Sequence, residues 1–401
     1  MPRGAHALRD WPTTTPYKRS RMSDAARPPQ HATATRRALW ASMLFYALIA
    51  FEFFYMASPF GAYFYAVYGP GLDWLQAFGL TGWTIQFFLP HIVAETRSVP
   101  VDVAETVGMI LFAGGLVGFA VGAFQIYRAK LRREEAVVTG VYRHIRHPQY
   151  LALIVASIGM ALIWPRYLVV IATVTVICIY IALGRLEEGI CLRQFPGYAA
   201  YMQSTGRFLP RRLVPRLAFP AATPGPVRVA AWCGAYLAAL AVALSAAAGL
   251  RAHALTSLYT LQTEEGTYLS VVAIGQDDLE AVARLAGSAP ATRAATSGRG
   301  PLLNYVLPAG MYVSEVPMRL PPGARFGHSV PSGRDPALYK VVFTEAVLDA
   351  GGRPEGEDVI AHAVNKIPLL EVHIDLRAGV VTNSFPPPET PFYGSRQVPV
   401  F

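Results

Sequence analysis

Charged residues are scarce in this chain. They make up 15% of the 401 residues, while hydrophobic residues make up 53%, and soluble domains usually contain about 25% charged residues. This balance argues against an ordinary soluble enzyme and favours a membrane protein. Cysteine is rarer still, because only Cys178, Cys191 and Cys233 occur, and none follows residue 233. Their spacing matches no metal-ligand motif, and the C-terminal part has no disulfide framework to hold it together.

Long apolar runs are present instead. Runs of about 20 residues are long enough to cross a bilayer, and the sequence predicts passages at 39–57, 106–126, 151–164, 167–184 and 227–250. The first run begins behind a long basic tail, which is too deep in the chain for a usual signal peptide. Residues 72–94 are also apolar, but polar side chains and Pro90 interrupt them, so we expect an interfacial or re-entrant stretch there.

Positive charge is concentrated in three segments, at 1–37, 128–146 and 185–228. Lys and Arg collect on the cytoplasmic side of membrane proteins, so we expect all three segments to be cytoplasmic. Predicted spanning helices separate them, which argues against a nucleic-acid surface. The sequence therefore predicts a disordered basic tail over residues 1–37 and an all-α polytopic membrane core over 38–252. That core contains about five passages, including a helical hairpin.

The remaining residues, 253–401, are predicted to form an α+β extramembrane domain on the outer side of a plasma or inner membrane. TYLSVVAI and LLEVHIDL are typical of strands, and DDLEAVARLAG is typical of a short helix. Residues 377–379 suit a hairpin turn, and SAPATRAATSGRGP is expected to be a flexible connector. No motif in this part indicates a chemistry or a protein partner.

The most informative stretch is GVYRHIRHPQY at residues 140–150, directly before an apolar run. His144 and His147 are spaced to share a helix face, but no aligned acid or cysteine completes a zinc site. Nine histidines in the whole chain are also too few for a membrane di-iron oxygenase. We therefore predict no metal here. A plain lipid-headgroup anchor explains Arg143 and Arg146, since basic side chains at a membrane border bind anionic lipid.

A ligand pocket explains more of this stretch. Pro148 suits the first turn of the following helix, which places His147 at a helix entrance that attracts anions. Glu187 and Glu188 follow the returning limb of the hairpin, so a short turn brings them close to the first cluster. The alternative is an Arg–Glu lattice that merely closes the hairpin. Both charge signs beside tyrosine rings suit S-adenosylmethionine, with its carboxylate, ribose hydroxyls and sulfonium.

These residues carry a resemblance. GVYRHIRHPQY, an apolar hairpin, RLEE and then FPGYAAYMQSTGRFLP resemble the membrane methyltransferases that include isoprenylcysteine carboxyl methyltransferase and the phosphatidylethanolamine N-methyltransferases. The resemblance covers roughly residues 105–212. Two positions depart from the phospholipid enzymes: Ala152 stands where glycine is frequent, and residues 114–118 read GGLVG without a clean G-x-G.

The resemblance implies a cytosolic pocket for S-adenosylmethionine and a lipophilic substrate that arrives from the bilayer. It assigns cofactor binding to Tyr142, Arg146, His147, Pro148, Tyr150, Glu187, Tyr198 and Tyr201, and catalysis to Glu188 and Arg185.

In this interpretation Glu188 or bound solvent assists deprotonation of an amine, and Arg185 or Arg146 gathers the negative charge of an anionic acceptor. A lipid amine is the favoured acceptor. The alternatives are a carboxylate or thiol acceptor, a catalytically inactive scaffold that displays the C-terminal domain, and a membrane protein of redox or transport function.

Overall fold

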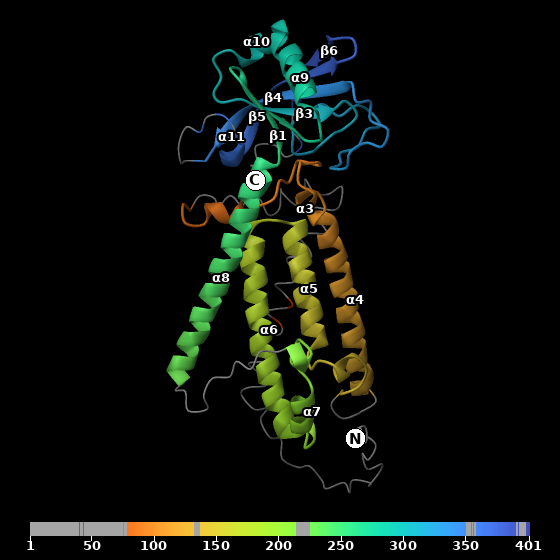
Figure 1. Ribbon diagram of the computed structural model, residues 1–401, viewed down its shortest axis with the longest axis vertical. Coiled ribbons are helices and arrows are strands. Elements are labelled where there is room, and N and C mark those ends of the chain that lie inside the picture. The colour runs from red at the N-terminus through yellow and green to blue at the C-terminus, as the bar shows by residue number, and fades with distance from the viewer. Residues whose placement is uncertain are drawn as a thin grey trace, which may run out of the picture.

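The computed structural model describes residues 78–131, 137–213, 225–349, 358–389 and 398–401, together with a few single residues. Four long helices stand side by side, and a six-stranded sheet lies at one end of them (Figure 1). The helices are α4 (Ala104–Leu131), α5 (Pro148–Ile163), α6 (Tyr167–Gln194) and α8 (Gly225–Thr256). The predicted tail and the predicted passage at 39–57 fall outside the described residues.

Three of these helices, α4, α6 and α8, are long and apolar enough to cross a membrane, and α5 is a shorter apolar helix of 16 residues. Helices were predicted at all four places, whereas the total of five passages stays a prediction. The structure extends α6 well beyond its predicted end at residue 184. At 1.5 Å per residue its 28 residues span about 42 Å, so Glu187 and Glu188 lie inside a helix and not after one.

Glycines bring α4 and α5 into backbone contact. A Cβ added at Gly115 would lie 2.6 Å from the carbonyl oxygen of Ala152, and one added at Gly159 would lie 2.5 Å from the backbone nitrogen of Phe112. Small residues allow membrane helices to approach this closely. Gly114, one position away, meets nothing within 4 Å, so it faces away from the seam.

Residues 78–98 connect the helices to the sheet. They contain the single-turn helix η1 (Gly82–Ile85), lead into α3 (Val99–Asp102), and include no spanning helix within the described part of the predicted re-entrant stretch. The N–H of Phe88 donates to the carbonyl of Pro165 in the α5–α6 turn at 2.8 Å, and the N–H of Ala94 donates to the carbonyl of Val271 at 2.7 Å. The segment therefore holds the hairpin turn against the sheet.

The sheet has the order β1-β2-β3-β4-β5-β6 and is antiparallel except for the parallel pair β2–β3. A parallel pair needs a crossover connection, which α9 (Gln276–Ser288) and α10 (Pro290–Thr296) supply; α11 is Asp358–His362. The strands are β1 (Tyr259–Thr263), β2 (Gly266–Ser270), β3 (Leu303–Pro308), β4 (Leu338–Leu348), β5 (Ala363–Asp375) and β6 (Val380–Phe385). We call residues 259–401 the sheet region.

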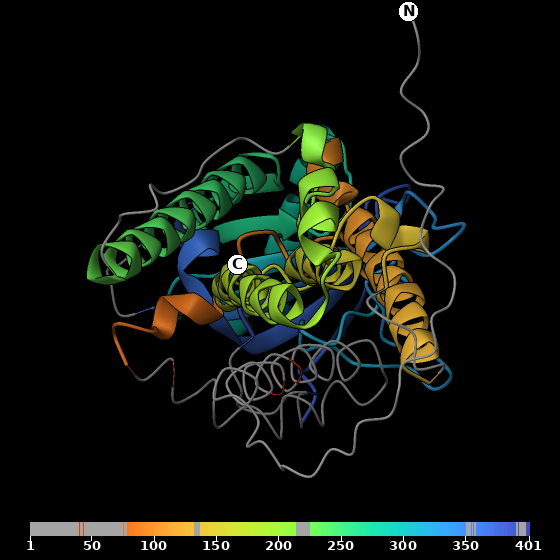
Figure 2. The same ribbon diagram turned by 90° about the horizontal axis from the view of Figure 1, so that it is seen from below.

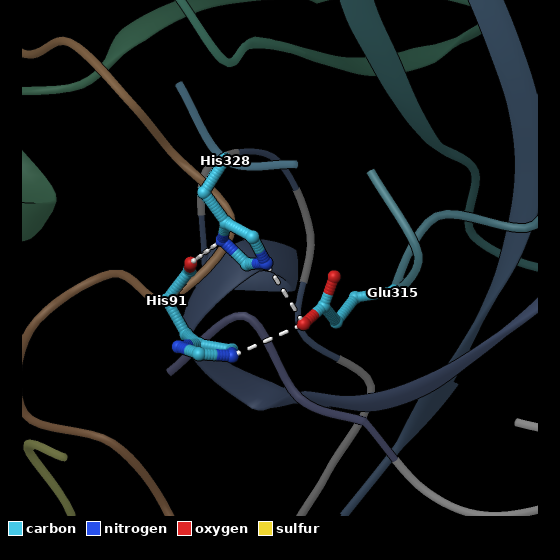
Figure 3. Close-up of side chains that lie close together, drawn as sticks. All are labelled: His91, Glu315 and His328. Atoms are coloured by element: carbon cyan, nitrogen blue, oxygen red, sulfur yellow. Dashed lines mark hydrogen bonds and ion pairs between the residues drawn. The ribbon is translucent and has the colours of Figure 1, made fainter. Parts of the chain in front are cut away.

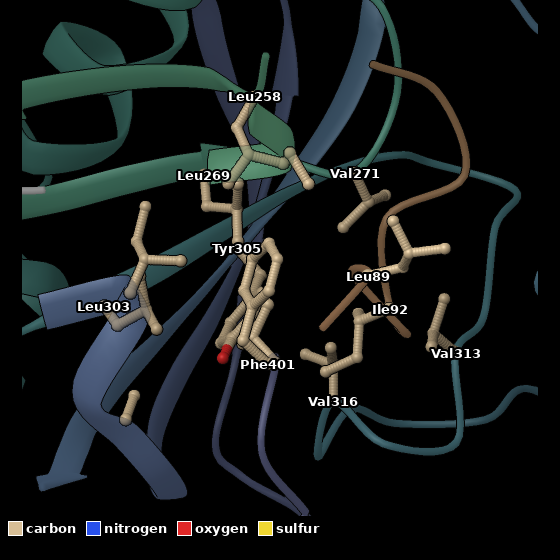
Figure 4. Close-up of a cluster of buried hydrophobic side chains, with 14 of the residues drawn as sticks. Leu89, Ile92, Leu258, Leu269, Val271, Leu303, Tyr305, Val313, Val316 and Phe401 are labelled. Carbon is tan, nitrogen blue, oxygen red and sulfur yellow. The ribbon is translucent and has the colours of Figure 1, made fainter. Parts of the chain in front are cut away.

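Both faces of the sheet are covered. One face packs against α9 through Leu279 and Val282. The other face carries Leu303 and Tyr305, which share a core with Leu89 and Ile92 of the 78–98 segment (Figure 4). Because this second core draws on both parts of the chain, burial of apolar surface fixes the sheet region to the end of the helices.

Several predictions for the sheet region are confirmed. The two predicted strands correspond to β2 and β5, the predicted helix is α9, and residues 377–379 turn between β5 and β6 with Gly379 at a φ of +67°. The flexible connector predicted at 288–301 is wrong, because Pro290–Thr296 form α10. Pro290 is favourable at a helix start, and the Thr292 hydroxyl donates to the carbonyl of Ala286 at 2.7 Å, which fixes α10 onto α9.

Candidate functional site

The predicted site residues lie mostly at the end of the helices that is remote from the sheet (Figure 1). This end contains η2 (Gly140–Arg143), the start of α5, the last turns of α6, and α7 (Tyr198–Ser204). The chain that leaves α7 pairs with the chain that enters α5. The N–H of Arg146 donates to the carbonyl of Gly206 at 2.9 Å, and the N–H of His147 donates to the carbonyl of Arg207 at 3.0 Å.

Glu188 is the centre of an ionic cluster. Its Oε1 accepts from Arg146 Nε at 2.7 Å and from Arg207 Nε at 3.0 Å, and its Oε2 accepts from Arg207 Nη2. The carboxylate is only 3% exposed. A buried charge needs partners of the opposite sign, and here both oxygens of Glu188 are occupied by guanidinium groups.

His147 joins the two acids. Its Nδ1 lies 3.4 Å from Glu187 Oε2, and its Nε2 lies 3.3 Å from Glu188 Oε1. These are ion-pair distances and not well-aligned hydrogen bonds. Burial opposes the charge on His147, but the two carboxylates outweigh it and raise the pKa of the imidazole. Gly184 makes room for the ring, since an added Cβ there would come within 3.3 Å of His147 Cδ2.

Glu187 is the accessible acid of the pair, with 26% of its side chain exposed. The hydroxyl of Tyr150 donates to Glu187 Oε1. The Tyr150 ring stacks on His147 at 5.5 Å and on Tyr180 at 4.8 Å between centroids. The structure therefore places a partly exposed carboxylate beside a stack of aromatic rings.

Three further tyrosines hold the surrounding elements together. The Tyr142 hydroxyl donates to Gln149 Oε1 at 2.9 Å, and the Tyr201 hydroxyl donates to the backbone carbonyl of Tyr142 at 2.5 Å. Tyr198 packs beside Tyr201, with ring centroids 5.5 Å apart. Burial raises the pKa of Tyr201 to about 12, so this hydroxyl stays protonated and keeps its donor role at neutral pH.

Not every predicted site residue belongs to the cluster. Arg185 stacks its guanidinium 3.8 Å above the Trp232 ring of α8, whereas Pro148 occupies the first turn of α5 as predicted. Arg207, a main partner of Glu188, was missed. The signal for it was present, because Arg207 stands in the trailing stretch FPGYAAYMQSTGRFLP, in which only the tyrosines were selected.

The side chains present suit S-adenosylmethionine chemically. Helix α5 leaves its first N–H groups without intrahelical acceptors, and its cap residue His147 makes no side-chain cap bond. Such a helix start attracts a carboxylate, and Arg207, with a quarter of its side chain exposed, adds a positive charge nearby. Glu187 supplies an acceptor for hydroxyl or ammonium groups, beside the buried and stacked ring of Tyr150.

Comparison with known proteins gives one match. Residues 104–196 match the family model described as phospholipid methyltransferase. No curated protein and no solved structure matches the chain. The matched residues include all of α4, α5 and α6, with Arg146, His147 and both acids, while Arg207 follows them. The apolar helices and this match mark the chain as an integral membrane protein. Residues 104–196 form a phospholipid methyltransferase domain and belong to the membrane methyltransferase superfamily that also contains isoprenylcysteine carboxyl methyltransferase.

Proposed function

We propose that this protein transfers a methyl group from S-adenosylmethionine to an acceptor dissolved in the membrane, and that the favoured acceptor is a lipid amine. The observation that carries the proposal is the cluster of Arg146, His147, Glu187 and Glu188 at the open end of an apolar helical hairpin. The cluster falls within the family-matched residues. A carboxylate or a thiol is the alternative acceptor.

When bound, the cofactor would supply a methyl group on a cationic sulfur, and the acceptor would form a bond to the methyl carbon as the carbon–sulfur bond breaks and the neutral thioether leaves. The protein has to bind the cofactor and the acceptor, orient them toward each other, and exclude water from between them. In our proposal Glu187 accepts hydrogen bonds from the ribose or the ammonium group. Arg207 and the start of α5 receive the carboxylate, and the stacked rings of Tyr150 and Tyr180 border the sulfonium.

The two acids take different roles in this proposal. Glu188 has both oxygens bound by Arg146 and Arg207, so we assign it as a positioning residue that fixes those two guanidinium groups. Glu187 is more exposed and holds one hydrogen bond from Tyr150. We therefore assign to Glu187 the removal of a proton from an amine acceptor. Arg185, on the side of α6 that faces α8, would serve an anionic acceptor.

The orientation in the membrane is also part of the proposal. The described parts of the basic segments, 128–131, 137–146, 185–213 and 225–228, lie at the cluster end of the helices (Figure 1), and Lys and Arg collect on the cytoplasmic side. We place the N-terminus and the cluster in the cytoplasm of a plasma or inner membrane, with the sheet region on the other side. Reporter fusions after Arg133 and Gly300 test this, and fluorescence from the same side for both would contradict it.

The deciding experiment is calorimetric titration of S-adenosylmethionine into the full chain in detergent, beside the variant Glu187→Gln. Binding by the wild type that the variant weakens supports the pocket. Incubation with radiolabelled cofactor and membrane lipids then identifies the acceptor. Label released by mild alkali indicates a methyl ester, whereas label that resists it indicates an N-methyl or S-methyl product, which chromatography of the labelled lipid head group separates.

If the folded wild-type protein fails to bind S-adenosylmethionine, the proposal that it is a methyltransferase is refuted. The membrane core would then be an inactive scaffold that displays the sheet region. The cluster would serve only to close the hairpin, which is the salt-bridge reading of the same contacts.

A further inference from the structure

A second group of titratable side chains lies at the opposite end of the helices, where the 78–98 segment meets the sheet region. His91 comes from the 78–98 segment, and Glu315 and His328 come from the long loop between β3 and β4 (Figure 3). One atom from each side chain, two imidazole nitrogens and a carboxylate oxygen, lies within 4.8 Å of the other two. The proposed methyl transfer uses none of these three residues.

The three side chains converge on a single atom. Glu315 Oε1 lies 3.2 Å from His91 Nε2 and 3.1 Å from His328 Nε2. Zinc in proteins is bound tetrahedrally by nitrogen and oxygen at about 2.0–2.1 Å, which places neighbouring ligand atoms roughly 3.3 Å apart. Both separations are close to that spacing, and Figure 3 marks the two contacts with dashed lines.

The outer contacts orient the ligand atoms inward. His328 Nδ1 lies 3.1 Å from the backbone carbonyl of His91, and a carbonyl only accepts, so Nδ1 carries the hydrogen. The lone pair of neutral His328 is then on Nε2 and points at Glu315. Ser314 donates to the other oxygen of Glu315 at 2.8 Å. A backbone carbonyl behind a histidine and a donor behind a carboxylate are the usual supports of a metal site.

Aromatic packing fixes the third ligand. The His91 ring stacks on Phe87 at 4.8 Å with an interplanar angle of 2°, and its edge meets Trp164 at 5.1 Å. The Glu315 side chain is 2% exposed, whereas His328 is 37% exposed. The buried Glu315 carboxylate faces Nε2 of both imidazoles, and a divalent cation held by these three atoms would compensate its charge. The partly open side at His328 gives that cation a route to solvent.

We infer that His91, Glu315 and His328 bind a zinc ion that joins the loop between β3 and β4 to the 78–98 segment. Two histidines and a glutamate form one of the common zinc ligand sets, with a fourth position left for water.

A matched pair elsewhere in the sheet region provides the control. His373 Nε2 lies 2.7 Å from Glu371 Oε1, and this glutamate is also buried. Within the described residues, no third ligand accompanies them. A histidine–glutamate ion pair alone is therefore present at His373 and is not expected to hold zinc.

The test uses the full chain in detergent, produced without a histidine tag, stripped with a chelator and dialysed against Zn²⁺. Metal content by mass spectrometry is expected to be one zinc per chain for the wild type and for His373→Ala. For His328→Ala and His91→Ala we expect the affinity for zinc to fall by more than about 100-fold. This exceeds the loss expected when a residue that only hydrogen-bonds to a metal ligand is removed. A wild type that holds no more zinc than His328→Ala would overturn the inference, as would loss of zinc in His373→Ala.

X-ray absorption of the zinc-loaded wild type gives a result that does not depend on how well the variants fold. We expect nitrogen and oxygen neighbours at about 2.0–2.2 Å, with the scattering of two imidazole rings. Sulfur neighbours, or a single imidazole, would place the ion elsewhere and refute the assignment.

Discussion

Replacing Glu187 and Glu188 one at a time by glutamine makes the same chemical change at two adjacent positions. The two carboxylates differ in environment, because Glu188 is 3% exposed with both oxygens bound, and Glu187 is 26% exposed. We expect Glu188→Gln to damage the fold of this end of the molecule. We expect Glu187→Gln to leave the fold intact and to weaken the binding of S-adenosylmethionine.

The contacts set the magnitudes. Glu188→Gln leaves the guanidinium groups of Arg146 and Arg207 facing a neutral amide, and breaking a buried ion pair costs about 3–5 kcal/mol. At Glu187 the amide oxygen can still accept from Tyr150, so the loss in stability is expected to be about 1 kcal/mol or less. A lost hydrogen bond between a carboxylate and the cofactor corresponds to roughly 1.5–3 kcal/mol, or a 10- to 150-fold weaker dissociation constant.

Thermal unfolding followed by circular dichroism in detergent, and calorimetric titration of S-adenosylmethionine, measure the two effects separately. The unfolding midpoint should fall much further for Glu188→Gln than for Glu187→Gln. If the two variants melt together, Glu188 is not the centre of the cluster. If Glu187→Gln binds the cofactor as the wild type does, Glu187 is not a cofactor ligand.

Three other substitutions test the fold and the charges. Gly115→Leu should separate α4 from α5 and lower the unfolding midpoint, whereas Gly114→Leu, which meets nothing within 4 Å, should leave it unchanged. Arg207→Lys keeps the charge but loses the two-pronged contact with the carboxylate, so we expect a loss of roughly 1.5–3 kcal/mol in thermal unfolding that the exposed Arg143→Lys does not show. Lys340 has no exposed surface, and burial lowers its pKa to about 8, below its unfolded value. The destabilising contribution of the Lys340 charge is therefore at its full size below pH 8. It decreases as the pH rises toward the pKa that Lys340 has in the unfolded chain. Lys340→Met should stabilise β4 by up to roughly 3 kcal/mol at pH 7 and roughly 2 kcal/mol at pH 9, measured by hydrogen exchange, and a gain that does not shrink with pH would contradict this reasoning.

The helices were the most predictable part of the fold, because long apolar runs have few alternatives to a spanning helix. The hairpin was predictable for the same reason, and its short turn correctly placed Glu187 beside His147. The end of α6 was less predictable. Charged residues from Arg185 onward suggested that the helix stopped there, yet α6 continues to Gln194 because backbone hydrogen bonding does not end at the membrane border.

Contacts between distant segments could not be read from the sequence. His91 and Glu315 are 224 residues apart in the sequence, yet His91 Nε2 contacts Glu315 Oε1. No local sequence pattern predicts this contact. His91 lies beside the sheet region, where its backbone carbonyl contacts His328 Nδ1 and its N–H donates to the carbonyl of Val400, and nothing in the sequence indicated this position. The strands β1, β3 and β4 were also missed, since pairing across a sheet and not local composition decides which short apolar runs become strands.

The closed seam between α4 and α5 restricts how a lipid can arrive. The described helices follow one another in the order α4, α5, α6, α8, with α8 standing apart from the first pair (Figure 2). At Gly115 and Gly159 the two backbones touch, so an acyl chain has no passage between α4 and α5. Helix α6 has α5 on one side and α8 on the other, and α8 is the least buried of the three candidate spanning helices. The proposed acceptor, if it moved from the bilayer between α6 and α8, would pass the Arg185–Trp232 pair, which connects these two helices.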